Sequence, residues 1–194
     1  QLDGIAEENI LLEPSRNNTA PCIAYATYKI LKQNPNANIV VAPSDHLILK
    51  EAAFLDKVTQ ALEYTSKNEA LLTLGISPTR PDTGYGYIHY ESQAESDVHA
   101  VSRFMEKPIL EKAKEYLASG DYLWNSGMFC FKPTVFLQEL QLYRPDIYES
   151  ALQAYKQSIK TQLAEVEQIL IDEACFGSVP DESIDYAVME KSTR

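Results

Sequence analysis

The sequence predicts an α/β fold with a mixed, mostly parallel sheet. Two stretches carry apolar residues at helical spacing, and each is followed by a short apolar run, of which the first contains several β-branched residues. This helix–strand–helix–strand order is typical of α/β proteins, in which helices connect parallel strands. The chain has 194 residues, of which 45% are hydrophobic, which is enough for one domain with a core.

The elements of the first half follow from periodicity and capping residues. Thr19 is the expected N-cap of the first helix, and the run at 38–42 is expected to form a buried parallel strand. In order, we predict a helix at 20–33, a strand at 38–42, a helix at 51–67 and a strand at 70–76.

The second half has less regular patterns. Gly120 ends one predicted helix, and Pro145 separates two others. We predict strands at 85–90, 98–105 and 122–131, helices at 109–119, 134–142 and 147–170, and a helix or turn at 183–190.

Charge and cysteine content exclude several classes of function. The net charge of −11 and the lack of a basic cluster argue against nucleic-acid and membrane-surface partners. The odd number of well-separated cysteines fits buried thiols in a reducing cytoplasm: Cys22, Cys130 and Cys175. The sequence contains no run of about 18 apolar residues, so no membrane span is predicted. The histidines show no zinc-ligand spacing.

The segment PSDH at 43–46 follows the strand predicted at 38–42. Ligands of open α/β sheets lie beyond the carboxyl ends of strands, where Asp45 could hold a divalent metal. The alternative is that Asp45 or Ser44 only caps the following helix.

Two further segments offer groups for a sugar phosphate. The glycines of TGYGYI, at 83–88, allow close backbone approach to a ligand, or they form a simple turn. Glu106 and Lys107 could grip sugar hydroxyls and a phosphate, or they could be an exposed charged pair at a strand end.

The last two candidates are a polar segment, Asn-Ser-Gly at 125–127, and an acidic residue. Asn125, within WNSGMF, could hydrogen-bond a sugar, or the step could be a strand bulge. Asp185, within SIDYAVMEK, could supply a second metal carboxylate or cap a helix.

Taken in order, these blocks resemble the bacterial mannose-1-phosphate guanylyltransferases, including bifunctional members with a phosphomannose isomerase domain. The blocks are PSDH, TGYGYI, F-x-EKP, WNSGMF and SIDYAVMEK, preceded by Glu13-Pro14 and NTAP at 18–21. The resemblance extends from about residue 10 to 192.

The resemblance implies a Rossmann-like nucleotidyltransferase fold, and an enzyme that uses Mg²⁺ to form GDP-mannose and pyrophosphate from GTP and mannose 1-phosphate. Asp45 and Asp185 would be the catalytic metal carboxylates. Residues implied for nucleotide binding are Asn18, Thr19, Ala20, Pro21, Ser44 and Asp45. Residues implied for the sugar phosphate are Gly84, Tyr85, Glu106, Lys107 and Asn125.

The chain departs from the family at two main places. Nothing matches the phosphate-cradling loop G-G-x-G-x-R-L-W-P, and the family continues beyond the SIDYAVMEK block, whereas this sequence stops at Arg194. A smaller departure is Asn17, which stands where many relatives carry a basic residue. We therefore expect a single nucleotidyltransferase-domain fragment over 1–194, truncated at both ends, with negligible activity alone. A homodimer would cover sheet edges left unpaired by a missing strand. Two alternatives remain: transfer to another sugar 1-phosphate, and a non-catalytic sugar-phosphate-binding module.

Overall fold

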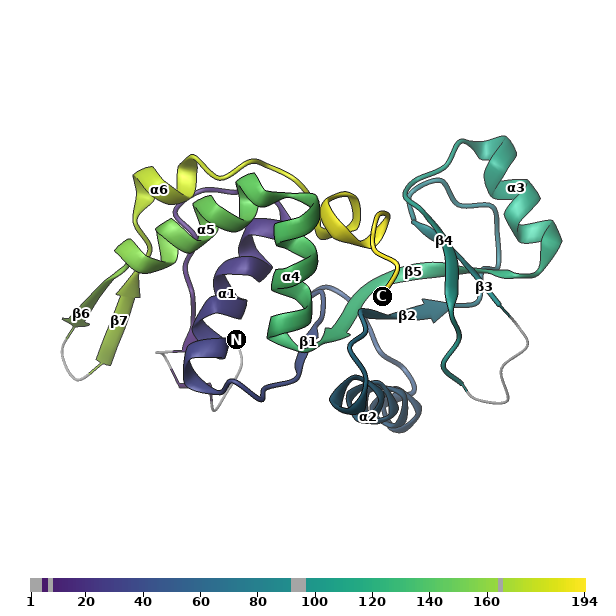
Figure 1. Ribbon diagram of the computed structural model, residues 1–194. Helices are drawn as coiled ribbons and strands as arrows, with labels where there is room; N and C mark the ends of the chain where they lie inside the picture. Colours follow the sequence, from purple (N-terminus) through teal and green to yellow (C-terminus); the bar gives the residue numbers. More distant parts are fainter. Residues whose placement is uncertain (1–4, 7–8, 92–96, 164–165) are drawn as a thin grey trace. The chain divides into compact units, whose positions relative to one another are not determined.

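The computed structural model describes residues 5–6, 9–91, 97–163 and 166–194, without the side chains of 160–168. Contacts divide the chain into two compact units (Figure 1). Unit 1 comprises residues 1–37 and 137–188, and unit 2 comprises 38–136 and 189–194. The single nucleotidyltransferase domain expected over 1–194 stays a prediction.

Unit 2 is built on a five-stranded sheet, in which each pairing is antiparallel. The order is β1-β5-β3-β4, and β2 also pairs with β5. The strands are β1 Ile39–Val41, β2 Leu72–Ile76, β3 Tyr87–Tyr90, β4 Val101–Met105 and β5 Tyr122–Phe131.

The long strand β5 organises this sheet. Both β1 and β2 pair with Cys130, so they lie on opposite edges of β5, and Trp124 likewise separates β2 from β3. Consequently β1 and β3 share one edge of β5, with residues 125–128 between their pairing sites. The carboxyl end of β1 and the start of β3 therefore meet beside the WNSGMF segment.

The expectation of a mostly parallel sheet is wrong for the described strands. β1 and β2 do run in the same direction, as expected for strands joined by a helix, but the antiparallel β5 lies between them. The alternation of helices and strands in 20–76 predicted that β1 and β2 would be direct neighbours, but β5, a later segment, lies between them. β1 is also not buried on both faces, since Val40 is 38% exposed.

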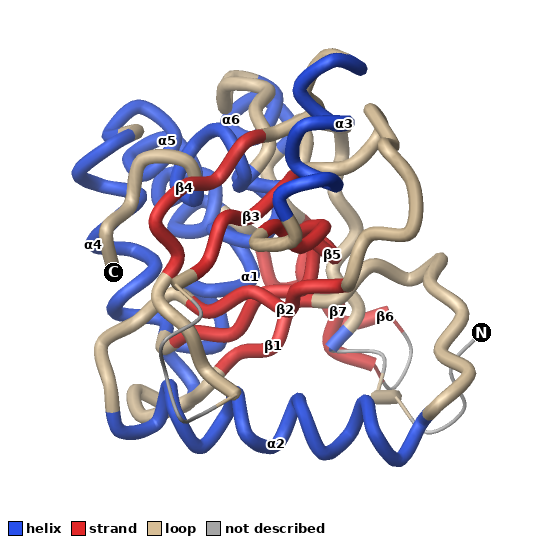
Figure 2. Tube along the Cα trace, turned by 90° about the vertical axis from the view of Figure 1, so that its right-hand side faces the viewer, coloured by secondary structure: helices blue, strands red, loops and turns tan. Residues whose placement is uncertain are grey.

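Two predicted helices of unit 2 are confirmed. α2, Glu51–Lys67, lies along β1 and β5 (Figure 2), and Thr65 Oγ1 lies 3.3 Å from Cys130 Sγ. α3, Leu110–Ser119, ends at Gly120, whose φ of 79° favours glycine.

Unit 1 is mainly helical. α1, Thr19–Gln33, packs against α5, Pro145–Gln157 (Figure 1). Tyr25, Ala154, Ile171 and Phe176 form a buried cluster in this unit. The remaining elements are the later part of α4 Pro133–Tyr143, the strands β6 Ile159–Leu163 and β7 Val166–Leu170, α6 Glu173–Gly177 and a π-helix at Asp185–Met189.

The helix predicted at 147–170 is wrong beyond Gln157. The chain continues as the antiparallel pair β6–β7. β-branched residues favour strands, and Ile159, Thr161 and Val166 carry that signal in the sequence. The short helix α6 was not predicted.

The cysteines are free, but only Cys130 is buried; Cys175 is half-buried and Cys22 is exposed. The prediction of buried thiols is therefore right for Cys130 alone. Among the helices in the described part of the chain, none is long and apolar enough to cross a membrane.

Candidate functional site

Glu106 and Asn125, predicted from separate motifs, meet around Gly86 in unit 2. The Asn125 N–H donates to the Gly86 carbonyl over 2.8 Å. A Cβ at position 86 would lie 2.4 Å from Glu106 Oε2 and 3.3 Å from Asn125 Cβ. Only glycine leaves room for the Glu106 carboxylate, whose side chain is 9% exposed. Gly86 therefore makes a close approach to the Glu106 side chain.

The Asn125 side chain is held in one orientation. Its Oδ1 accepts hydrogen bonds from Thr73 Oγ1 over 3.0 Å and from the Gly127 N–H over 3.1 Å. In the pairing of β2 with β5, Thr73 lies opposite Phe129 and Gly75 lies opposite Asn125, so β5 has more residues than β2 between these two pairs. The strand bulge left open as an alternative is thus present, and it turns Asn125 toward Thr73, which the sequence did not single out.

Lys107 extends the cluster with a positive charge. Its Nζ lies 2.9 Å from Glu106 Oε1, and the Glu106 N–H donates to Glu190 Oε1 over 2.9 Å. Lys107 has a φ of 44°, a left-handed conformation that costs a non-glycine residue about 1 kcal/mol or more. Such strained residues gather at functional sites, which supports a ligand role for this turn.

Tyr85 packs against Trp124 at a tilted angle, whereas Gly84 lies in a turn. The Tyr85 and Trp124 ring centroids are 5.1 Å apart, and the Arg80 guanidinium carbon lies 5.3 Å from the Trp124 centroid. The Gly84 N–H donates to Asp82 Oδ1 over 2.8 Å. This bond, followed by that from Arg80, holds the pKa of Asp82 below its usual value. Gly84 thus lies in a turn, and its binding of a sugar phosphate stays a prediction.

Ser44 and Asp45 follow β1 in an exposed turn. The preceding residue, Pro43, lies beside Gly127, because a Cβ on Gly127 would be 3.5 Å from Pro43 Cγ. The N-cap of α2 is Lys50, with no side-chain capping bond, so neither Asp45 nor Ser44 caps this helix.

The predicted nucleotide segment lies beside the Asp185 segment within unit 1. Thr19 Oγ1 accepts from the Ile184 N–H over 2.9 Å, and the Ala20 N–H donates to the Glu182 carbonyl over 3.1 Å. Thr19 is therefore not the helix cap. That role belongs to Asn18, whose Oδ1 accepts from the Thr19 N–H over 3.0 Å. Pro21 is buried in the first turn of α1.

Asp185 is half-buried and begins the π-helix. Ser183 Oγ accepts from the Tyr186 N–H over 3.4 Å, so Ser183 takes the capping position. Asp185 belongs to unit 1 and Asp45 to unit 2. Their pairing at one metal therefore stays a prediction. In the described part of the chain, no three His, Cys, Asp or Glu side chains gather as a metal cluster.

Asn17, to which no structural role was assigned from sequence, is only 7% exposed in unit 1. Its Nδ2 donates to the Phe176 carbonyl over 3.0 Å and to the Val179 carbonyl over 2.6 Å, and its Oδ1 accepts from Ser15 Oγ over 2.8 Å. Asn17 thus fastens the chain just before the nucleotide segment to residues 176–179. A polar residue inside a polar run offers no local signal for such burial.

Replacing Asn17 by Ala is expected to lower the free energy of unfolding by about 1–3 kcal/mol, because the Val179 carbonyl loses the Asn17 donor and the Phe176 carbonyl keeps only backbone donors such as the Val179 N–H. Urea denaturation followed by circular dichroism measures this change. The matched control is Asn36→Ala at an exposed position, expected within about 0.5 kcal/mol of wild type. Equal stability of the two variants would show that Asn17 does not fasten this segment.

A family model described as nucleotidyl transferase matches residues 3–168. The mannose-1-phosphate guanylyltransferase of Escherichia coli K12 is 44% identical over 191 residues, which are 95% of this chain and 39% of that protein. The chain thus spans about two fifths of the length of this relative.

Two solved structures have the same fold. A mannose-6-phosphate isomerase from Helicobacter pylori has a TM-score of 0.83 at 34% identity, covering 93% of this chain and 67% of that chain. A mannose-1-phosphate geranyltransferase from Thermus thermophilus has a TM-score of 0.80 at 30% identity, covering 95% and 50%. The expected α/β nucleotidyltransferase fold is confirmed, and the chain belongs to the nucleotidyl transferase family.

Proposed function

We propose that this chain forms the sugar-phosphate and metal side of a cytoplasmic mannose-1-phosphate guanylyltransferase, which makes GDP-mannose and pyrophosphate from GTP and mannose 1-phosphate. The observation that carries the proposal is the meeting of Gly86, Glu106 and Asn125 within unit 2. The similarity to the Escherichia coli guanylyltransferase supports this choice of substrates.

The reaction is an in-line displacement at phosphorus. A phosphate oxygen of mannose 1-phosphate attacks the α-phosphorus of GTP, a new P–O bond forms, and pyrophosphate leaves with the electrons of the broken bond. Glu106 accepts hydrogen bonds from sugar hydroxyls, Asn125 orients the ring, and Lys107 faces the phosphate as a point charge. Their contribution is positioning, which lowers the entropic part of the barrier without a covalent enzyme intermediate.

Asp45 and Asp185 are the proposed Mg²⁺ ligands. Mg²⁺ typically takes one or two carboxylates and completes its shell with water and substrate phosphate. Asp45 fits this role, because its exposed carboxylate has no hydrogen bond or ion pair with the residues that the structure describes. When bound, Mg²⁺ supplies charge neutralisation at the α-phosphate.

The proposed guanine and ribose contacts are Asn18, Thr19, Ala20, Pro21 and Ser44, together with Asp45. The fixed attachment of Thr19 and Ala20 to residues 182–184 supports this assignment, because it holds the nucleotide segment beside the residue that precedes Asp185. Preorganisation of this kind lowers the cost of ordering the site on binding.

The assay of nucleotide choice uses a loop-containing protein, meaning one in which the family's Gly-rich loop precedes this chain. With mannose 1-phosphate, we expect kcat/KM for GTP to exceed that for UTP and dTTP by about a hundredfold or more, since a site with placed polar groups rejects the wrong base. Pyrophosphate release measures each rate. Preference for UTP would contradict the proposal.

The same assay on residues 1–194 alone is expected to give negligible pyrophosphate release, because the chain contains no loop to cradle the triphosphate. Because the similar Helicobacter pylori protein is named an isomerase, mannose 6-phosphate is a second test substrate. Isomerisation without guanylyl transfer by the loop-containing protein would overturn the proposed reaction.

A further inference from the structure

The two faces of the β3–β4–β5 region carry different side chains. Gly86, Glu106 and Asn125 belong to the face of the candidate site. Residues one step along each strand point to the opposite face, because side chains alternate along a strand. Cross-strand pairing places His89 opposite Arg103 and also opposite Tyr122 on that second face.

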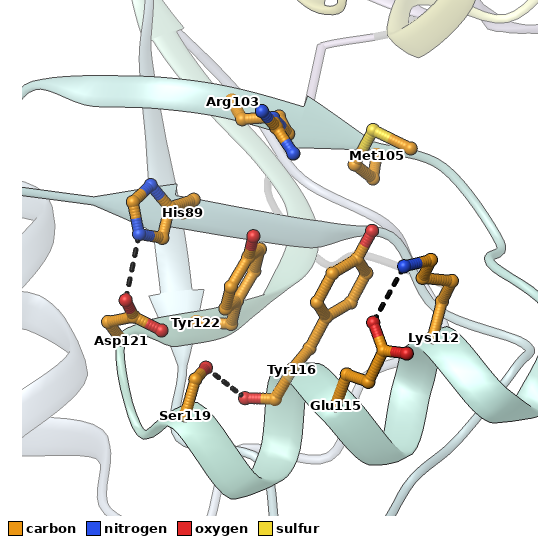
Figure 3. A pocket seen from close by; sticks show the side chains of 9 residues that line it. All are labelled: His89, Arg103, Met105, Lys112, Glu115, Tyr116, Ser119, Asp121 and Tyr122. Atoms are coloured by element: carbon orange, nitrogen blue, oxygen red, sulfur yellow. Dashed lines mark hydrogen bonds and ion pairs between the residues drawn. The ribbon is translucent and has the colours of Figure 1, made fainter.

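A pocket lies on this second face, between the strands and α3 (Figure 3). Its volume is about 490 Å³, within the range of about 300–1,000 Å³ that is typical of small-molecule sites. All its lining residues belong to unit 2 and lie in the described part of the chain. The strands contribute His89, Arg103 and Met105, and α3 contributes Lys112 and Tyr116.

The carboxylates of the pocket already have partners. Glu115 Oε2 lies 2.7 Å from Lys112 Nζ, and Asp121 Oδ2 lies 2.9 Å from His89 Nε2. The Arg103 guanidinium, in contrast, makes no hydrogen bond or ion pair with a residue that the structure describes. Arg103 therefore contributes a positive charge to the pocket, and its donors have no hydrogen-bond partner in the described part of the chain.

Two tyrosine hydroxyls add further donors. The Tyr116 and Tyr122 rings stack with centroids 4.1 Å apart, and in Figure 3 both hydroxyls point toward the strand that carries Arg103. Neither hydroxyl makes a hydrogen bond to a described residue. The stack holds both rings in place, so their hydroxyls need no rearrangement to donate to a bound oxyanion.

We propose that this pocket is a second ligand site, which binds the phosphate group of a small phosphorylated metabolite through Arg103, Tyr116 and Tyr122. A planar guanidinium matches two phosphate oxygens at once, and phenolic hydroxyls donate to a third. The net charge of −11 repels anions from the protein as a whole, so binding here depends on these placed donors. The site lies on the sheet face opposite Glu106 and Asn125 and is independent of the proposed reaction.

The test is a titration of the ¹⁵N-labelled chain with inorganic phosphate at constant ionic strength, followed by NMR. We expect saturable shifts at Arg103, Tyr122 and the amides of α3. Arg103→Gln should weaken this binding about tenfold, and Tyr122→Phe should weaken it about threefold. The matched control, Lys67→Gln, removes one positive charge from an exposed position of α2 and should bind phosphate like wild type.

Two phosphate esters, mannose 1-phosphate and GMP, are then titrated as competitors of inorganic phosphate. The proposal expects at least one of them to displace inorganic phosphate from the α3 resonances, and the tighter of the two identifies the kind of metabolite. It is overturned if the shifts do not saturate, if Arg103→Gln binds like wild type, or if neither ester displaces phosphate. Shifts confined to residues 106–107 would also overturn it, because they report the candidate sugar site instead.

Discussion

Asp45→Asn in the loop-containing protein is expected to lower kcat for GDP-mannose formation by about 10²–10³-fold, and Asp185→Asn is expected to have a similar effect. Each change removes a proposed carboxylate ligand while keeping the size of the side chain, and a bound metal contributes several kcal/mol of charge stabilisation. Asp45 caps no helix and makes no ion pair with a described residue, so its loss should leave the fold intact.

Steady-state pyrophosphate release over a range of Mg²⁺ concentrations measures this effect. The Mg²⁺ concentration needed for half-maximal rate should rise in both variants. Asp181→Asn is the matched control, because Asp181 is exposed in the same segment as Asp185 but is not a proposed ligand. Wild-type kcat and Mg²⁺ dependence in Asp45→Asn would remove Asp45 from the metal site.

Gly86→Ala is expected to lower kcat/KM for mannose 1-phosphate by about 10–100-fold with little loss of stability, since small misplacements of positioning groups have effects of this size. The added Cβ would lie 2.4 Å from Glu106 Oε2, so the carboxylate must move. The displaced atom is the end of a flexible side chain, and the backbone can therefore stay in place. The effect should be functional rather than structural.

Gly177→Ala provides the control for this variant, because a Cβ at position 177 meets nothing within 4 Å. Initial rates at varied mannose 1-phosphate and thermal unfolding are measured for both variants. Gly86→Ala with the same kcat/KM as Gly177→Ala would mean that Glu106 does not position the sugar.

The sequence predicts the helices well because their signals are local. The apolar spacing within 51–67 matches the bounds of α2, and Gly120 ends α3 as expected. The order of the strands is not local. β5 enters between β1 and β2 from more than forty residues further along the chain, and no alternation within 38–76 indicates its arrival.

The candidate site shows the same division. Motif order identifies Glu106 and Asn125 as functional candidates, but only the structure shows that both contact the space around Gly86. The sequence did not single out Gly86, because glycines two residues apart cannot be distinguished by composition, and the binding role of Gly84 stays a prediction. Asn17 was missed because its partners are backbone carbonyls some 160 residues away.

The most direct test of the account is the binding of mannose 1-phosphate to the 194-residue chain, followed by calorimetry and by NMR. We expect saturable binding at millimolar concentrations, with perturbed amides at Glu106, Lys107 and Asn125, and weaker binding by Gly86→Ala. No heat at millimolar ligand, together with no change at these three amides, would contradict it.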